Sequence, residues 1–185
     1  MYDVTATGEL LIDFTRNGLS EQNNRIYEAN PGGAPCNVLA MLGKLGYKTA
    51  FIGKVGDDEF GKLLKNTITE QKIDSTGLIL DPNAKTTLAF VDNDETGDRS
   101  FSFYRKPGAD MMLREDEVNY ELIDNCRIFH FGSLSMTDEP VRSATYAMVD
   151  YAKKKNKIIS FDPNLRPPLW ESEDLAAKQI WYGIE

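Results

Sequence analysis

The chain has 185 residues, with 21 Lys+Arg against 29 Asp+Glu for a formal net charge of −8, and 41% of its residues are hydrophobic. This composition is typical of a folded globular protein, and the acidic balance argues against nucleic acid or an anionic membrane as a partner. Two cysteines and one histidine exclude a disulfide framework and a multi-cysteine zinc site, and no apolar run approaches the roughly 18 residues that cross a bilayer. The first residues lack the basic segment and cleavage site of a signal peptide, so we expect a cytoplasmic location.

The first part of the chain alternates strand and helix patterns. Period-two alternation predicts a strand over Tyr2–Gly8, and a polar loop is expected from Glu9–Asp13 onward. The later elements expected here are a short strand over 25–30, a helix with Pro35 in its first turn and Gly46 after its end, a strand over 48–55 and a helix over 60–71. This order is typical of a parallel sheet covered by helices.

The middle of the chain interrupts that alternation. Thr86–Asp92 and Arg99–Arg105 are strand-like, and the residues NDETG between them favour a turn, which together predict a hairpin. Because no helix follows either strand, the hairpin is interpreted as an appendage to the main sheet.

The last third returns to the earlier pattern. The elements expected are a strand over 127–131, a helix over 139–155, a strand over 157–162 and a helix from about Ser172, with a proline-rich open segment before it. The single histidine, His130, lies in an apolar strand and is expected to be a hydrogen-bonded core residue. The fold class is therefore α/β.

Four segments carry candidate ligand-binding residues. Asp13 and the DPNLR segment (Asp162–Arg166) follow strands, and ligands bind beyond the carboxyl ends of strands in open α/β sheets. Gly32-Gly33 opens a helix, where the backbone can approach a ligand closely, and Asn37 lies about one turn further on. The fourth segment is the end of the predicted hairpin, FSFYR. Taken singly, each has an ordinary structural explanation as a turn or a buried strand face.

The common nucleotide fingerprints are absent from the sequence. GELLID follows the first strand in place of G-x-G-x-x-G, and no G-x-x-x-x-G-K-[ST] occurs, which disfavours a dinucleotide-dependent oxidoreductase and excludes a Walker-type phosphate loop.

Longer segments resemble one family. The stretch from Gly32 to Gly61 (GGAPCNVLAMLGKLGYKTAFIGKVGDDEFG) is similar to the first signature of the ribokinase-like (PfkB) carbohydrate kinases. GELLIDF, FSFYRKPGAD and FDPNLRPPLW resemble further segments of the bacterial fructokinases within that family, in the same order. The resemblance spans essentially all 185 residues.

The resemblance implies a fold and a subunit arrangement. We expect a Rossmann-like three-layer sandwich with a mostly parallel sheet and a small β-sheet lid, formed by segments at about 11–33 and 84–106. The chain 1–185 would be the N-terminal portion of one kinase domain, with its C-terminal part absent. Dimers through the lid are common among relatives and imply a homodimer as the first expectation.

The resemblance also implies site residues. Sugar-hydroxyl contacts are expected from Asp13, Gly33 and Asn37, with Gly32 beside them. Phe103 would pack on the apolar face of the sugar. The residues expected near phosphate or nucleotide are Arg105, Arg166 and Asn164.

The implied activity is transfer of the γ-phosphate of ATP, with Mg2+, to a sugar hydroxyl, and fructose to fructose 6-phosphate fits best. The family's catalytic aspartate belongs to a G-A-G-D-like motif that these residues lack, so no catalytic or metal-binding residue is assigned and the general base is expected beyond residue 185. The similar string Pro107–Asp110 is interpreted as unrelated, with Asp110 capping a helix over 115–123. We therefore expect the chain alone to be inactive and prone to association.

Two alternatives stay open. The chain could belong to a family member that acts on ribose, a nucleoside or a keto-deoxy sugar acid, because specificity rests on a few side chains. It could also be a non-catalytic sugar-binding remnant.

Overall fold

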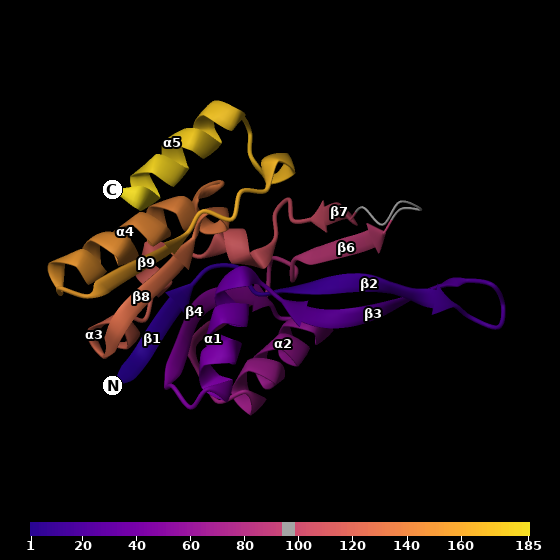
Figure 1. Cartoon of the computed structure of the whole chain (residues 1–185), viewed down its shortest axis with the longest axis horizontal. Helices are drawn as coiled ribbons and strands as arrows, with labels where there is room; N and C mark the ends of the chain where they lie inside the picture. The colour runs from indigo at the N-terminus through magenta and orange to yellow at the C-terminus, as the bar shows by residue number, and fades with distance from the viewer. Residues whose placement is uncertain (94–98) are drawn as a thin grey trace.

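The structure is a computed structural model that describes residues 1–93 and 99–185, with side chains described outside 92–101. Its main sheet has five parallel strands in the order β5-β4-β1-β8-β9. Their bounds are β1 Tyr2–Thr7, β4 Thr49–Gly56, β5 Ile73–Asp81, β8 Cys126–Gly132 and β9 Ile158–Asp162. Figure 1 shows this sheet between two helical layers, which confirms the expected α/β sandwich.

The two helical layers bury separate cores. Helices α1 (Ala34–Lys44) and α2 (Glu59–Glu70) cover one face, over a cluster that includes Leu39, Phe51 and Leu64. Helices α3 (Glu121–Asp124), α4 (Val141–Lys154) and α5 (Glu173–Ile184) cover the other, over Phe129, Phe131 and Met148. Apolar side chains thus leave water on both faces of the sheet, as parallel strands require.

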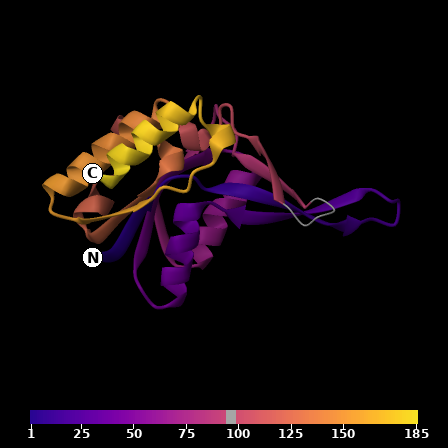
Figure 2. The ribbon, with the colours of Figure 1, turned by 45° about the horizontal axis from the view of Figure 1, so that its top comes forward.

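A second sheet of four strands extends from this body (Figures 1 and 2). Its order is β3-β2-β6-β7, with bounds β2 Leu11–Leu19, β3 Arg25–Gly32, β6 Leu88–Asn93 and β7 Arg99–Tyr104. The outer pairs are antiparallel hairpins, and β2 joins β6 in parallel. The predicted hairpin is therefore confirmed as separate from the main sheet, although part of its NDETG link lies outside the described residues.

Two rows of side chains lie on opposite faces of this small sheet. Asn30, Asp13, Ala89 and Phe103 are partners in register across the four strands, so their side chains share a face. The next row contributes Phe14 and Phe90, whose rings stack at 4.9 Å on the opposite face, with Phe60 of α2 packed edge-on against Phe14 at 5.6 Å. The period of two thus sets Asp13 and Phe103 on one face and Phe14 and Phe90 on the other.

Two expectations about elements fail. The polar loop into which Glu9–Asp13 was expected to lead is wrong, because Leu11–Leu19 is a strand that pairs on both sides and buries Leu11 and Ile12. Strand Ile73–Asp81 was not expected, since polar residues and Gly77 interrupt its pattern and a register irregularity interrupts its pairing with β4.

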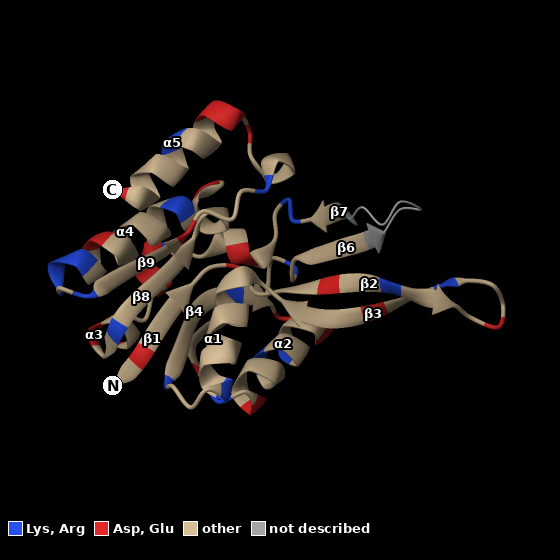
Figure 3. Ribbon diagram, viewed as in Figure 1, with Lys and Arg blue, Asp and Glu red and all other residues tan. Residues whose placement is uncertain are grey.

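The surface carries both signs of charge. Figure 3 shows Lys and Arg, and Asp and Glu, distributed over both helical layers. No helix in the described part of the chain is long and apolar enough to cross a membrane.

Candidate functional site

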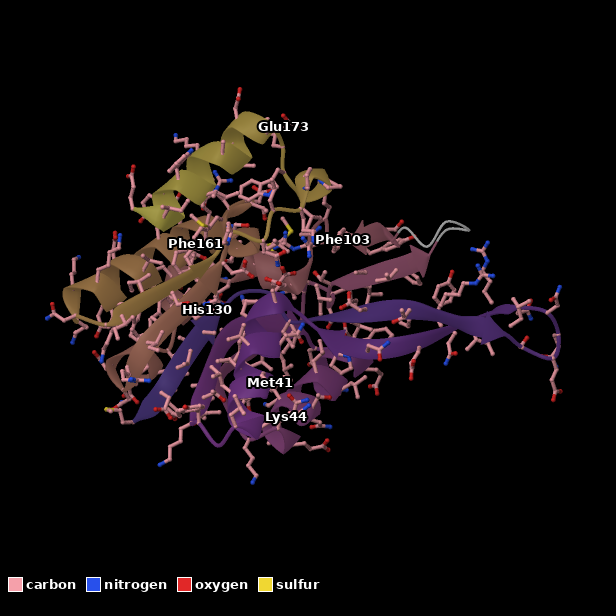
Figure 4. The ribbon with its side chains drawn as sticks, in the orientation of Figure 1. Met41, Lys44, Phe103, His130, Phe161 and Glu173 are labelled. Carbon is pink, nitrogen blue, oxygen red and sulfur yellow. The ribbon has the colours of Figure 1, made fainter. Side chains whose placement is uncertain are left out.

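A cavity of about 150 Å³ lies where the small sheet meets the carboxyl ends of β1 and β9. Figure 4 shows Phe103 at this junction. The cavity is lined by Glu9, Leu11, Asp13, Gly33, Ala34, Asn37, Phe103, Leu134, Asn164 and Arg166. Six of the eight residues singled out in the sequence therefore meet in one place; Gly32 and Arg105 lie beside it.

Asp13 brings a carboxylate to the cavity from β2. Burial raises the pKa of its carboxyl above the ordinary value. A Cβ on Gly32 would lie 2.2 Å from Asp13 Oδ2, closer than atoms can approach. Gly32 thus leaves room for the Asp13 carboxylate, whose oxygens accept hydrogen bonds from hydroxyl groups.

Gly33 and Asn37 come from the start of α1. Gly33 is the residue before the first turn, with φ +119°, and a Cβ there would lie 2.3 Å from the Glu9 carbonyl oxygen. Only glycine fits this conformation and this close approach. The Asn37 N–H donates to the Gly33 carbonyl at 3.0 Å, so the turn that carries the Asn37 side chain is closed.

Glu9 was not identified from the sequence. It lies between β1 and β2, only 4% exposed, and its Oε1 accepts the Ala34 N–H at 2.8 Å. Burial raises the pKa of Glu9 from 4.5 to about 7, against the opposing effects of that hydrogen bond and of Arg105. The available signal was a lone acidic residue within the otherwise apolar run that follows β1.

Arg105 lies outside the cavity lining and is 3% exposed. Its Nε donates to Asp110 Oδ2 at 2.7 Å, its Nη1 to Thr137 Oγ1 at 3.0 Å and its Nη2 to the Leu134 carbonyl at 2.9 Å. The structure therefore places Arg105 as a buried link between the small sheet and the loop after β8.

The expected capping role of Asp110 is wrong. Asp110 lies in a 3₁₀ turn, Ala109–Met112, and accepts hydrogen bonds from Arg105 and from the Thr87 hydroxyl. Residues 115–123 form a 3₁₀ turn at Glu115–Glu117 and the start of the short helix α3, without a continuous helix to cap. Asp110 instead pairs with the buried Arg105 guanidinium, because an unpaired charge inside a protein is costly.

Arg166 and Asn164 approach from the loop after β9. The Asn164 N–H donates to Asp162 Oδ1 at 3.1 Å, which shapes the turn, and Arg166 Nη1 donates to the Leu165 carbonyl at 3.3 Å. Both residues border the cavity, and Arg166 is largely exposed. Its cation is thus available to an anion there.

His130 takes no part in this site. It is buried in β8, and its Nδ1 lies 3.0 Å from Ser160 Oγ, which confirms the expected core position with a hydrogen bond. Burial lowers its pKa.

The fold and cavity define a class of protein. A parallel sheet presents a small polar cavity at its carboxyl edge, beside a helix N-terminus and a second sheet, which is where ligands bind in open α/β folds. Residues 1–183 match the pfkB family of carbohydrate kinases. The chain belongs to that family.

Individual relatives agree with this assignment. The chain is 46% identical over 179 residues to probable fructokinase-2 of Arabidopsis thaliana, covering 96% of this chain and 54% of the relative. A structure of fructokinase from Xylella fastidiosa with bound ATP is 36% identical with a TM-score of 0.91, covering 100% of this chain and 56% of that one. A double mutant of the Vibrio cholerae O395 fructokinase, with fructose, ADP and potassium bound, is 33% identical with a TM-score of 0.86, covering 100% and 57%. The chain thus spans about half the length of these relatives.

Proposed function

We propose that the protein to which this chain belongs transfers the γ-phosphate of ATP to a sugar hydroxyl, converting fructose to fructose 6-phosphate. One observation carries the proposal: Asp13, Asn37 and Phe103 border the same cavity in a chain similar to fructokinases, one of them with fructose bound. A neutral sugar suits a site whose nearest polar groups are hydrogen-bonding carboxylate, amide and backbone.

The residues of this chain would hold the sugar. Asp13 accepts hydrogen bonds from its hydroxyls, the Asn37 amide both donates and accepts, and the Phe103 ring covers the apolar face and excludes water. Arg166 lies at the open side of the cavity, where its cation would stabilise phosphate oxygens.

ATP, with a magnesium ion on its phosphates, would supply the transferred group. Asn164, on the same loop as Arg166, is the residue of this chain that we assign to the nucleotide. In the described part of the chain, no group of three or more acidic, histidine or cysteine side chains is placed to hold a metal ion, so we assign none to magnesium.

We further propose that the 185-residue chain alone has no turnover, because it contains no G-A-G-D-like segment to supply the aspartate that accepts the hydroxyl proton. Sugar-dependent ATP consumption by the purified 185-residue chain would contradict this proposal.

The function is tested on the full product of the natural reading frame. ATP consumption is measured across fructose, glucose, ribose, a nucleoside and a keto-deoxy sugar acid. Fructose should be preferred, and Asp13→Ala should lower kcat/KM for fructose at least 100-fold by leaving hydroxyls unpaired. Asp116→Asn is the matched control, because Asp116 is 74% exposed and outside the cavity. Preference for another acceptor, or full activity of Asp13→Ala, would overturn the proposal.

We also propose a homodimer through the small sheet. Leu19, Ile26 and Tyr104, on three different strands of this sheet, are 51%, 41% and 66% exposed, and exposed apolar side chains favour association. Sedimentation velocity should show a dimer that Leu19→Lys with Ile26→Lys converts to monomer; a monomeric parent would contradict it.

A further inference from the structure

The Gly8–Glu9 turn packs directly on the first turn of α1. A Cβ on Gly8 would lie 2.5 Å from Pro35 Cγ, and a Cβ on Gly33 would lie 2.3 Å from the Glu9 carbonyl oxygen. Two glycines on opposite sides of the contact are therefore needed for the backbones to approach. Such closeness means that a displacement of the Glu9 turn displaces Gly33.

The first turn of α1 lacks the cap that most helices have. Its N-cap residue is Gly33, which has no side chain to accept a hydrogen bond, and Pro35 has no N–H to offer. The Ala34 N–H is instead satisfied by Glu9 Oε1 at 2.8 Å. Glu9 thus supplies from the β1–β2 turn the oxygen that a serine or aspartate supplies in an ordinary cap.

The surroundings of Glu9 suit a hydrogen-bond acceptor rather than an ion pair. The charged groups that act on it are Arg105 and Asp110, which lie within their own buried pair at 2.7 Å. From α1 it faces the buried Cys36 thiol. Arg105 is already paired with Asp110, so it is not a dedicated partner for Glu9.

Glu9 also borders the cavity together with Ala34 and Asn37. The helix start that Glu9 caps therefore presents two of the groups expected to meet the ligand, the Gly33 backbone and the Asn37 amide. In the described structure this start has no other side-chain cap.

We propose that Glu9 is a positioning residue of the sugar site, which holds the Ala34 N–H and so fixes the Gly33–Asn37 turn in its binding geometry. The proposal rests on the proposed function, because it names what orients the sugar contacts. It assigns Glu9 no part in proton transfer.

The test compares Glu9→Gln with Glu9→Ala in the full product of the reading frame. The glutamine carbonyl oxygen can accept the Ala34 N–H, whereas alanine leaves that donor unsatisfied. We expect Glu9→Ala to raise the KM for fructose at least 10-fold, and Glu9→Gln to keep it within about 3-fold of the parent. Neither variant should lower kcat as steeply as it raises KM.

Ser172→Ala is the matched control. Ser172 Oγ caps α5 by accepting the Leu175 N–H at 3.1 Å and is exposed away from the cavity lining. Its loss should lower the melting temperature without changing the KM. An equal rise in KM for Ser172→Ala and Glu9→Ala would overturn the proposal, because general loss of a helix cap would then explain both.

A second measurement does not need the sugar. Amide hydrogen exchange over 33–37 in the 185-residue chain should accelerate at least 10-fold in Glu9→Ala and stay near the parent in Glu9→Gln. If exchange accelerates in Glu9→Ala but the parent protein does not bind fructose, the positioning role is retained and the proposed function is rejected. Unchanged exchange in Glu9→Ala would overturn the positioning role whatever the sugar results.

Discussion

The buried pair of Arg105 and Asp110 gives the sharpest stability prediction. The two side chains are 3% and 2% exposed, and Arg105 Nε lies 2.7 Å from Asp110 Oδ2. Asp110→Asn keeps the shape of the side chain and removes its charge. The Arg105 guanidinium would then be buried without a counter-charge, which is more damaging than the loss of a surface contact.

The magnitude follows from this burial. Removing one partner of a buried ion pair costs about 3–5 kcal/mol, which is a large part of the roughly 5–15 kcal/mol that stabilises a typical domain. For a chain of this length the melting temperature should fall by about 6–20 °C. Arg105→Met combined with Asp110→Leu removes both charges and should recover most of the loss, because no charge is then left unpaired.

Urea denaturation, monitored by circular dichroism, measures the change in the free energy of unfolding. An unchanged slope m indicates that unfolding stays two-state in the variant. The control is Asp116→Asn, which breaks the Arg114–Asp116 pair at 3.1 Å, where the two side chains are 57% and 74% exposed. Exposed pairs contribute about 0–1 kcal/mol. If Asp110→Asn and Asp116→Asn change stability equally, burial does not govern the pair and the reasoning is refuted.

Three further predictions concern the cavity and the outer helix. Gly33→Ala should destabilise by at least about 2 kcal/mol, from strain at φ +119° and from contact with the Glu9 carbonyl; Gly46→Ala, at φ +90° with open space around it, should show the strain alone, and equal urea midpoints would contradict this. The folded-state pKa of Glu9, about 7, lies above its ordinary 4.5, so its contribution to stability is complete below pH 4.5 and is lost as pH rises through 7. Glu9→Gln should remove up to about 3 kcal/mol of that pH dependence, measured by urea denaturation at pH 5 and pH 8, and an unchanged pH profile would refute it. Trp181 is 62% exposed beside an apolar groove on α5, so Trp181→Lys should reduce self-association of the 185-residue chain in sedimentation velocity with little change in melting temperature; association unchanged by it would count against that groove.

Local signals in the sequence were sufficient for most elements. The helical spacing after Pro35 acts within a few residues of the chain, and so do two caps that the structure shows, Asp58 on the Gly61 N–H of α2 and Ser172 on the Leu175 N–H of α5. These features depend on backbone hydrogen bonds and side chains close in sequence, which is why a single sequence predicts them.

What the sequence did not predict depends on distant partners. Strand β2 is stabilised by pairing with β3 and β6, and its own residues alternate too weakly to predict it. The roles of Glu9 and Asp110 are set by Ala34 and Arg105 across the fold. A buried charge has no local signature, because its counterpart or its hydrogen-bond donor is brought to it only by the tertiary structure.

The parallel pairing of β2 with β6 has a consequence for which sequence changes the cavity tolerates. Asp13 and Phe103 belong to different hairpins, and the Asp13–Ala89 and Ala89–Phe103 register is what sets them on one face. A slip of β6 against β2 by one residue would turn the ring of Phe103 to the far side while Asp13 stayed in place. A single deletion between Thr87 and Ala89 would therefore move the Phe103 ring away from the face that carries Asp13.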